Sequence, residues 1–144
     1  MKREIKFRGW RRKYQCWEYG YLIECAAPEL NEIVEVIKHG GRIIAAVERD
    51  SIGQYTGLHD KNGREIYEGD IVSFGSVWNN SDNEDIDEEF HIGVVEYDPH
   101  YAVYNVNCEE SGERRFMFTD VVNYDGFGVI GNIFENPELL EGKQ

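Results

Sequence analysis

Short strand-like segments, separated at close spacing by turn-forming residues, are the feature of this sequence that most restricts its fold. Apolar and β-branched segments occur at 43–47, 55–58, 65–67, 71–78, 91–97, 101–106, 114–118 and 127–134. The pair Asn62-Gly63 is a strong hairpin signal, because both residues readily adopt positive φ. Many short strands and few helices predict a mainly β protein (α+β) with a bent antiparallel sheet or small SH3-like barrel.

The N-terminal third mixes strand and helix patterns. Residues 4–8 alternate in polarity and residues 14–23 are aromatic and β-branched, so both segments are predicted strands. Residues 29–38 carry an apolar stripe at helical spacing that ends at Gly40-Gly41, which predicts a helix. The alternative is a hairpin of 33–37 with 43–47 around the two glycines. A further short helix is predicted after Pro137, with Asn136 as its cap.

These patterns predict an N-terminal α+β part over 1–50 and a barrel-like part over 51–144 that ends in the short helix, both in one folding unit. Residues 51–134 should form a single bent antiparallel sheet or small barrel. Residues 80–89 should be an exposed acidic loop, because like charges repel one another and the run has little apolar surface to bury. The predicted core is Phe7, Trp17, Ile37, Leu58, Ile66, Ile71, Val72, Val94, Tyr104, Phe116, Val129 and Ile133.

Composition indicates an intracellular, acidic protein. The 144 residues carry a formal net charge of −13 and include three scattered cysteines, a set that suits a reducing cytoplasm better than a disulfide framework. No apolar run reaches the ~20 residues of a membrane helix, so no membrane partner is expected. A protein that binds bare DNA backbone usually carries the opposite net charge.

The sequence contains no convincing catalytic or cofactor motif. Gly126, Gly128 and Gly131 match a dinucleotide-binding pattern, but they precede a strand pattern where a helix would be required. The segment 58–69 fails as a calcium loop, because its first and last positions are Leu58 and Gly69. The histidines are scattered, and the acids beside Cys108 disfavour its thiolate. We therefore expect no enzyme, no cofactor and no metal site; a small enzyme or ligand binder stays an alternative.

One stretch combines basic and aromatic residues and is the candidate binding face: Arg8, Trp10, Arg11, Arg12 and Lys13. Arginine beside exposed rings can hold single-stranded nucleic acid by stacking and phosphate contact. The competing interpretation places the tryptophans in the core. The expected role is a macromolecule-binding module with a protein partner; nucleic acid is the alternative partner, and a homo-oligomer stays open.

Three stretches stand out by their order and spacing: Arg3–Trp10, the long run Gln54–Val72 (QYTGLHDKNGREIYEGDIV) and Val129–Leu140 (VIGNIFENPELL). Together they resemble the YopX family of proteins encoded by bacteriophages and prophages. The resemblance spans nearly the whole chain, although Gly9 stands where such sequences commonly have Ala. It implies a strand-rich fold with a barrel-like C-terminal part and an accessory phage role in the cytoplasm of a bacterial host. It supplies no catalytic residues.

Overall fold

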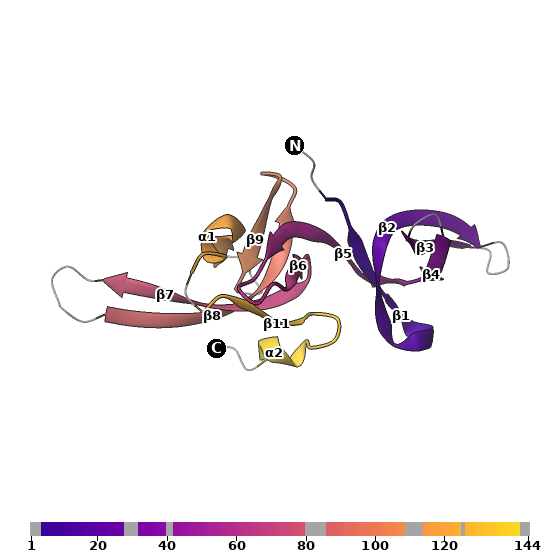
Figure 1. The fold of residues 1–144 in the computed structure, drawn as a ribbon. Coiled ribbons are helices and arrows are strands. Elements are labelled where there is room, and N and C mark those ends of the chain that lie inside the picture. Colours follow the sequence, from indigo (N-terminus) through magenta and orange to yellow (C-terminus); the bar gives the residue numbers. More distant parts are fainter. Residues whose placement is uncertain are drawn as a thin grey trace. The chain divides into compact units, whose positions relative to one another are not determined.

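The computed structural model describes residues 4–27, 32–39, 42–79, 86–108, 114–124 and 126–141. Within these residues the chain is mainly β, with few and short helices (Figure 1). The elements are β1 (Phe7–Arg11), η1 (Arg12–Tyr14), β2 (Cys16–Ala27), β3 (Glu32–His39), β4 (Arg42–Ala46), β5 (Glu48–His59), β6 (Glu65–Tyr67), β7 (Asp70–Asn79), β8 (Ile86–Asp98), β9 (Val103–Asn107), β10 (Arg115–Met117), α1 (Phe118–Val121), β11 (Gly128–Asn132) and α2 (Glu138–Glu141). The chain divides into two units, Met1–Leu58 and His59–Gln144.

The first unit is an antiparallel sheet in which β4, β3, β2, β1 and β5 are neighbours in that order. η1 connects β1 to β2 along the chain. The two strands pair with each other, and Trp10 lies directly opposite Trp17. Side chains alternate between the two faces of a strand, so Arg8 and Trp10 share a face with Trp17, Tyr19 and Tyr21. β1 also pairs with β5, and the register shifts between Arg8 and Trp10.

The helix predicted for 29–38 is wrong, and the alternative hairpin is correct. β3 covers Glu32–His39 and pairs on one side with β2 and on the other with β4, where Val36 faces Ala46. Ile33, Val34, Val36 and Ile37 are β-branched, and such side chains lose less freedom in a strand than in a helix. A glycine pair ends helices but also turns hairpins, so the Gly-Gly signal did not discriminate. Residues 28–31 lie outside the described part of the chain.

The second unit is an antiparallel sheet with the strand order β10-β9-β8-β7-β11. Its edge strands are different elements, β10 and β11, so the part of the sheet that the structure describes does not close into the predicted SH3-like barrel. The single sheet predicted over 51–134 is also wrong, because β5, which holds residues 51–59, pairs with β1 of the first sheet. The turn at Asn62-Gly63 is confirmed: Gly63 has a φ of 81° and donates its N–H to the carbonyl of Asp60 at 3.0 Å.

β7 and β8 form a long two-stranded ribbon (Figure 1). Their pairing runs from Ile71 opposite Val94 to Asn79 opposite Ile86, so β8 begins five residues before the predicted start at His91. Antiparallel pairing with β7 gives the backbone of 86–90 ladder hydrogen bonds on one side, an energetic gain that composition alone did not reveal. The prediction of a loop is therefore wrong for 86–89, while 80–85 lie outside the described residues.

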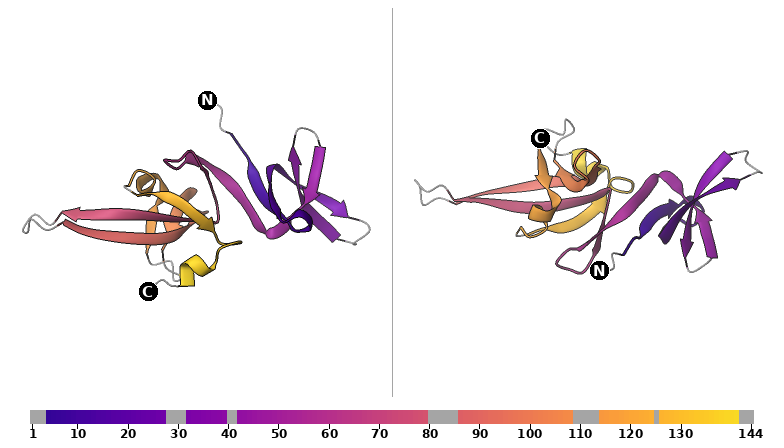
Figure 2. Two further views of the ribbon diagram at one scale, coloured as in Figure 1. Left: turned by 60° about the horizontal axis from the view of Figure 1, so that its bottom comes forward. Right: turned by 90° about the horizontal axis from the view of Figure 1, so that it is seen from above.

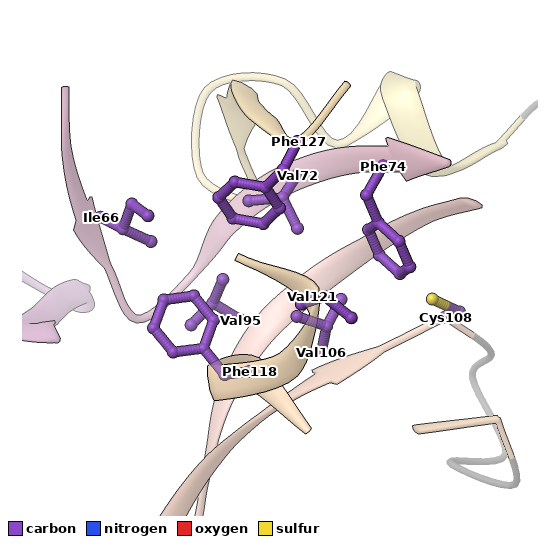
Figure 3. Close-up of a cluster of buried hydrophobic side chains, with 9 residues drawn as sticks. All are labelled: Ile66, Val72, Phe74, Val95, Val106, Cys108, Phe118, Val121 and Phe127. Atoms are coloured by element: carbon purple, nitrogen blue, oxygen red, sulfur yellow. The ribbon is translucent and has the colours of Figure 1, made fainter. Parts of the chain in front are cut away.

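The core of the second unit gathers on one face of this sheet, beneath α1. Figure 3 shows side chains from β6, β7, β8, β9, α1, the residue after β9 and the segment before β11 converging: Ile66, Val72, Phe74, Val95, Val106, Cys108, Phe118, Val121 and Phe127. Gly93 lies in the middle strand, and a Cβ there would come within 2.6 Å of Val106 and 2.9 Å of the Cys108 sulfur. The strands β8 and β9 therefore need a glycine at this position.

The predicted core is correct in part. Ile66, Ile71 and Val72 are fully buried, and Tyr104, Phe116 and Val129 pack against the buried cluster. Phe7, Trp17 and Val94 are only half-buried. Leu58 and Ile133 are exposed, because each lies where a strand gives way to a turn. The side chain of Ile37 lies outside the described residues.

Candidate functional site

Asp60 explains the central sequence motif structurally. Its Oδ1 accepts the N–H groups of Asn62 and Arg64, each at 2.9 Å, which fixes the turn after β5. Its Oδ2 accepts the N–H of Val129 in β11 at 3.3 Å, although the two residues are 69 positions apart. One buried carboxylate thus ties the turn to an edge strand of the second sheet. Because its oxygens accept backbone N–H groups of the turn and of β11, Asp60 has a structural role in this motif.

The second turn of this motif is also a structural device. Gly69 has a φ of 87°, a conformation that favours glycine. Asp70 is 1% exposed, and its Oδ2 accepts the N–H of Tyr67 at 2.8 Å. The backbone of Gly69 bonds to Val95 through its N–H and to Ile133 through its carbonyl, both at 2.9 Å. The turn therefore connects β7, β8 and the segment after β11.

The closing motif forms a compact loop around Asn132. The Oδ1 of this residue accepts the N–H groups of Phe134 and Glu135, and its backbone N–H bonds to Asn136 Oδ1 at 3.3 Å. Asn136 therefore directs its side chain to the loop and not to the start of α2, where we predicted a cap. A Cβ on Gly131 would lie 2.7 Å from Asn136 Oδ1, so glycine makes room for the loop. Figure 2 shows this loop in yellow, between β11 and the short helix α2. The three glycines of the rejected nucleotide motif likewise lie within or next to strand β11.

The side chains of His91 and Cys108 are buried in the second unit. His91 is buried, and its ring packs against those of Phe74 and Phe116 at centroid distances of 5.2 and 4.9 Å. Cys108 is buried in the core cluster. Among the described residues, no three His, Cys, Asp or Glu side chains are grouped so that they could hold a metal ion.

Cys16 is half-buried at the start of β2, beside Glu18. Partial burial is the main reason that the pKa of its thiol is raised, and the hydrogen bond to Glu18 Oε1 at 3.6 Å and the charge of Glu18 raise it further. The cation of Arg11 opposes these effects. Since the thiolate is the reactive form, Cys16 is a poor nucleophile.

In the structure the candidate binding face has two parts. One, the stacked part, consists of the residues that contact the Trp17 ring, and the other is a turn that we call the tip. Arg8 is 6% exposed, and its guanidinium lies over the Trp17 ring at 4.6 Å from the centroid. Trp10 meets the same ring edge-on at 5.3 Å. Lys6 covers the Tyr55 ring in the same way at 5.3 Å. Cations and rings therefore stack on one another across β5, β1 and β2 and stiffen this sheet.

The tip is the turn between β1 and β2, residues 11–15. Arg11 lies over the ring of Tyr14 at 4.2 Å and forms an ion pair with Glu18 at 3.6 Å. Arg12 has a side chain that is 80% exposed, and its Nε lies 2.8 Å from Glu48 Oε1. Lys13 is exposed, and its Nζ lies 5.6 Å from the centroid of the same Tyr14 ring. Arg11, Arg12 and Lys13 therefore lie in one turn, but carboxylates lie beside Arg11 and Arg12.

Two exposed tyrosines extend the stacked part and were missed by the sequence reasoning. Tyr19 is 42% exposed and Tyr21 is 61% exposed, and both lie on the face of Trp17. We call Trp10, Trp17, Tyr19 and Tyr21 the aromatic face. The signal that could have identified it is the alternation of aromatic residues at 17, 19 and 21 in a predicted strand.

Charge is distributed unequally between the two units. Residues 1–58 contain ten Lys and Arg against eight Asp and Glu, whereas 59–144 contain five against twenty. The formal charges are therefore +2 and −15, which add to the −13 of the whole chain. The excess negative charge belongs to the second unit, and the aromatic face lies in the nearly neutral first unit.

Comparison with known proteins identifies the family. None of the described helices is long and apolar enough to cross a membrane. No curated protein matches the chain. A crystal structure of protein EF1440 from Enterococcus faecalis is similar with a TM-score of 0.55 and 23% identity, over 96% of this chain and 99% of that one, which supports the fold. The family model described as YopX protein matches residues 6–141, nearly the whole chain. As the motifs at both ends and in the middle predicted, the chain belongs to the YopX family.

Proposed function

We propose that this protein is a non-enzymatic module that binds a protein partner through the aromatic face of its first unit. In this proposal it is an accessory protein of a phage or prophage and acts in the cytoplasm of the bacterial host. The observation that carries the proposal is the exposure of Tyr19 and Tyr21 beside the rings of Trp10 and Trp17, which meet edge to face. Tyrosine, tryptophan and arginine are enriched at the centres of protein interfaces.

The rigidity of this face supports the proposal. Trp17 is held between the Arg8 guanidinium and the edge of Trp10, and its strand is paired on both sides. Rings that are already ordered lose little conformational entropy when a partner covers them. A tyrosine also brings a hydroxyl group that can bond to a polar rim.

The same contacts make a nucleic-acid partner less favoured. A phosphate backbone is bound by cations that are available to replace counterions. Here Arg8 is buried over a ring, and Arg11 and Arg12 lie beside Glu18 and Glu48. A unit with a formal charge of only +2 offers little long-range attraction for a polyanion.

The proposal is tested by capturing partners from a phage-infected host lysate with wild-type protein and with the double variant Tyr19→Ala/Tyr21→Ala. A captured protein is then identified and its affinity is measured with purified components. We expect the double variant to weaken binding by at least about tenfold, as is typical when interface anchors are truncated. Tyr19→Phe/Tyr21→Phe keeps the rings and should retain most of the affinity.

One control shows whether a loss of binding comes from the aromatic face itself, and one assay tests the alternative partner. Phe90→Ala removes an aromatic side chain that is 80% exposed in the second unit and should leave binding unchanged. An electrophoretic shift assay with single- and double-stranded DNA and RNA tests the alternative partner. A shift that disappears in Arg12→Ala/Lys13→Ala would replace the protein-binding proposal with a nucleic-acid one.

A further inference from the structure

The turn between β8 and β9 exposes a second group of aromatic rings, in the second unit. Tyr97 at the end of β8 is 45% exposed, and Tyr101 in the turn is 71% exposed. Tyr104 faces Tyr97 across the two strands, and the two rings meet edge to face at 5.5 Å. The His100 ring packs edge-on against Tyr101 at 4.6 Å. We call Tyr97, His100, Tyr101 and Tyr104 the aromatic turn.

Hydrogen bonds and core contacts hold the aromatic turn in place. Asp98 accepts the backbone N–H of His100 at 2.9 Å and the side-chain amide of Asn105 at 3.2 Å. Tyr104 continues inward to Phe118 of the core cluster, with a centroid distance of 6.1 Å. The exposed rings are thus anchored to the folded sheet, so that the turn is an ordered surface.

The charge around the aromatic turn indicates what can cover it. Residues 65–113 contain fourteen Asp and Glu and no Lys or Arg. Glu96 and Asp98 are the chain neighbours of Tyr97 and are half-buried, on the opposite face of β8 from the Tyr97 ring. Exposed tyrosine rings attract a guanidinium or ammonium group through the negative potential of the ring face. Residues 65–113 supply no cation for these rings, so a cationic partner complements both the rings and the negative charge of this unit.

We propose that the aromatic turn binds a cationic segment of another protein, with Arg or Lys side chains packed against Tyr97 and Tyr101. The negative charge of the second unit draws the segment in, and the rings hold it at short range. Nucleic acid is disfavoured at this surface, since its phosphates would meet the unit with a formal charge of −15. This surface is distinct from the aromatic face, and the inference does not depend on the function proposed above.

The test uses a capped tetra-arginine peptide as the probe and the full-length protein, with binding followed by amide chemical shifts in NMR titrations. We expect the largest shifts at residues 97–104. Tyr101→Ala should weaken binding about two- to five-fold, the size of an exposed cation–π contact. Tyr97→Ala/Tyr101→Ala should weaken it further. Tyr101→Phe keeps the ring and should bind like wild type.

Matched variants decide whether the rings or the diffuse charge bind the peptide. Phe90→Ala removes an exposed ring from the same cation-free stretch and should bind like wild type. If all of these variants bind equally, or if Phe90→Ala loses as much affinity as Tyr101→Ala, the proposal is wrong. Shifts on the aromatic turn caused by a single-stranded oligonucleotide would also overturn it. Tyr101 is mostly exposed, so its variants should fold, and an unchanged spectrum of the core amides verifies this.

Discussion

Removing the Asp60 carboxylate tests whether the central sequence motif is structural. Asp60→Ala leaves three backbone N–H groups without their acceptor, those of Asn62, Arg64 and Val129. A hydrogen bond to a charged group contributes about 1.5–3 kcal/mol to the free energy of unfolding. Two of the three N–H groups lie in a surface turn, where water can replace the carboxylate. We therefore expect a loss of about 3–5 kcal/mol, a large part of the ~5–15 kcal/mol typical of a domain.

The loss should be visible in urea and thermal unfolding followed by far-UV circular dichroism. For a unit of this size, 1 kcal/mol corresponds to about 4–8 °C, so the melting temperature should fall by more than about 12 °C. Asp60→Asn keeps an acceptor for the two turn N–H groups and loses the bond to Val129 and the charge, so it should cost less. In that variant the Val129 amide should exchange faster with solvent than in wild type.

Asp98 provides the matched control, because its side chain also accepts a turn N–H, while its second bond, to Asn105, stays within the hairpin of β8 and β9. Asp98→Ala should cost about 1 kcal/mol. The reasoning is refuted if Asp60→Ala unfolds within about 1 kcal/mol of wild type, or if Asp98→Ala costs as much.

Further predictions concern packing, stacking, thiol chemistry and cooperativity. Gly131→Ala places a Cβ 2.7 Å from Asn136 Oδ1, so it should destabilise the second unit by about 1–3 kcal/mol in urea unfolding; an unchanged midpoint would contradict this. Trp17→Ala removes the ring stacked by Arg8 and Trp10 and should cost about 3 kcal/mol, near the lower limit for a buried aromatic, because Trp17 is only half-buried; an unchanged melting curve would argue against it. The raised pKa of Cys16 predicts slow alkylation at pH 8, measured peptide by peptide, and Glu18→Gln should accelerate it; an equal rate would exclude the effect of Glu18. If the chain is one folding unit, as the sequence predicts, probes in the two units should report a single unfolding transition.

The sequence predicted the second unit better than the first because its turns have specific chemistry. Asn62-Gly63 and Gly69-Asp70 each form a turn whose backbone conformation few other residues adopt. Both turns lie where the sequence predicts them. The segment at 32–39 offers only periodicity, and a short apolar run fits a helix and a strand almost equally well. Its β-branched composition was the better guide. The predicted barrel is not found in the described residues for a different reason. Closure of a barrel depends on long-range pairing of edge strands, which local patterns do not specify.

The candidate site was predicted as a group of residues but not as a surface. Proximity in sequence was enough to place the cations on β1 and the following turn. It could not show that Arg8 would be buried over Trp17, because that contact depends on the pairing of β1 with β2. It also could not show Glu48 beside Arg12, which depends on the position of β5. The exposure of side chains and the pairing of charges arise from tertiary contacts. The proposed preference for a protein partner rests on these contacts.

The position of β11 in the second sheet has a consequence for the order of folding. β7 ends at Asn79 and β11 begins at Gly128, yet the two strands pair and Asp60 bonds to Val129. Contacts between such distant residues close a long loop and are expected to form late. Until they form, the edge of β7 that β11 later covers is open to strands of other chains. Fourteen acids in 65–113 repel a second copy of the same stretch, so the negative charge of this unit also protects it from aggregation while it folds.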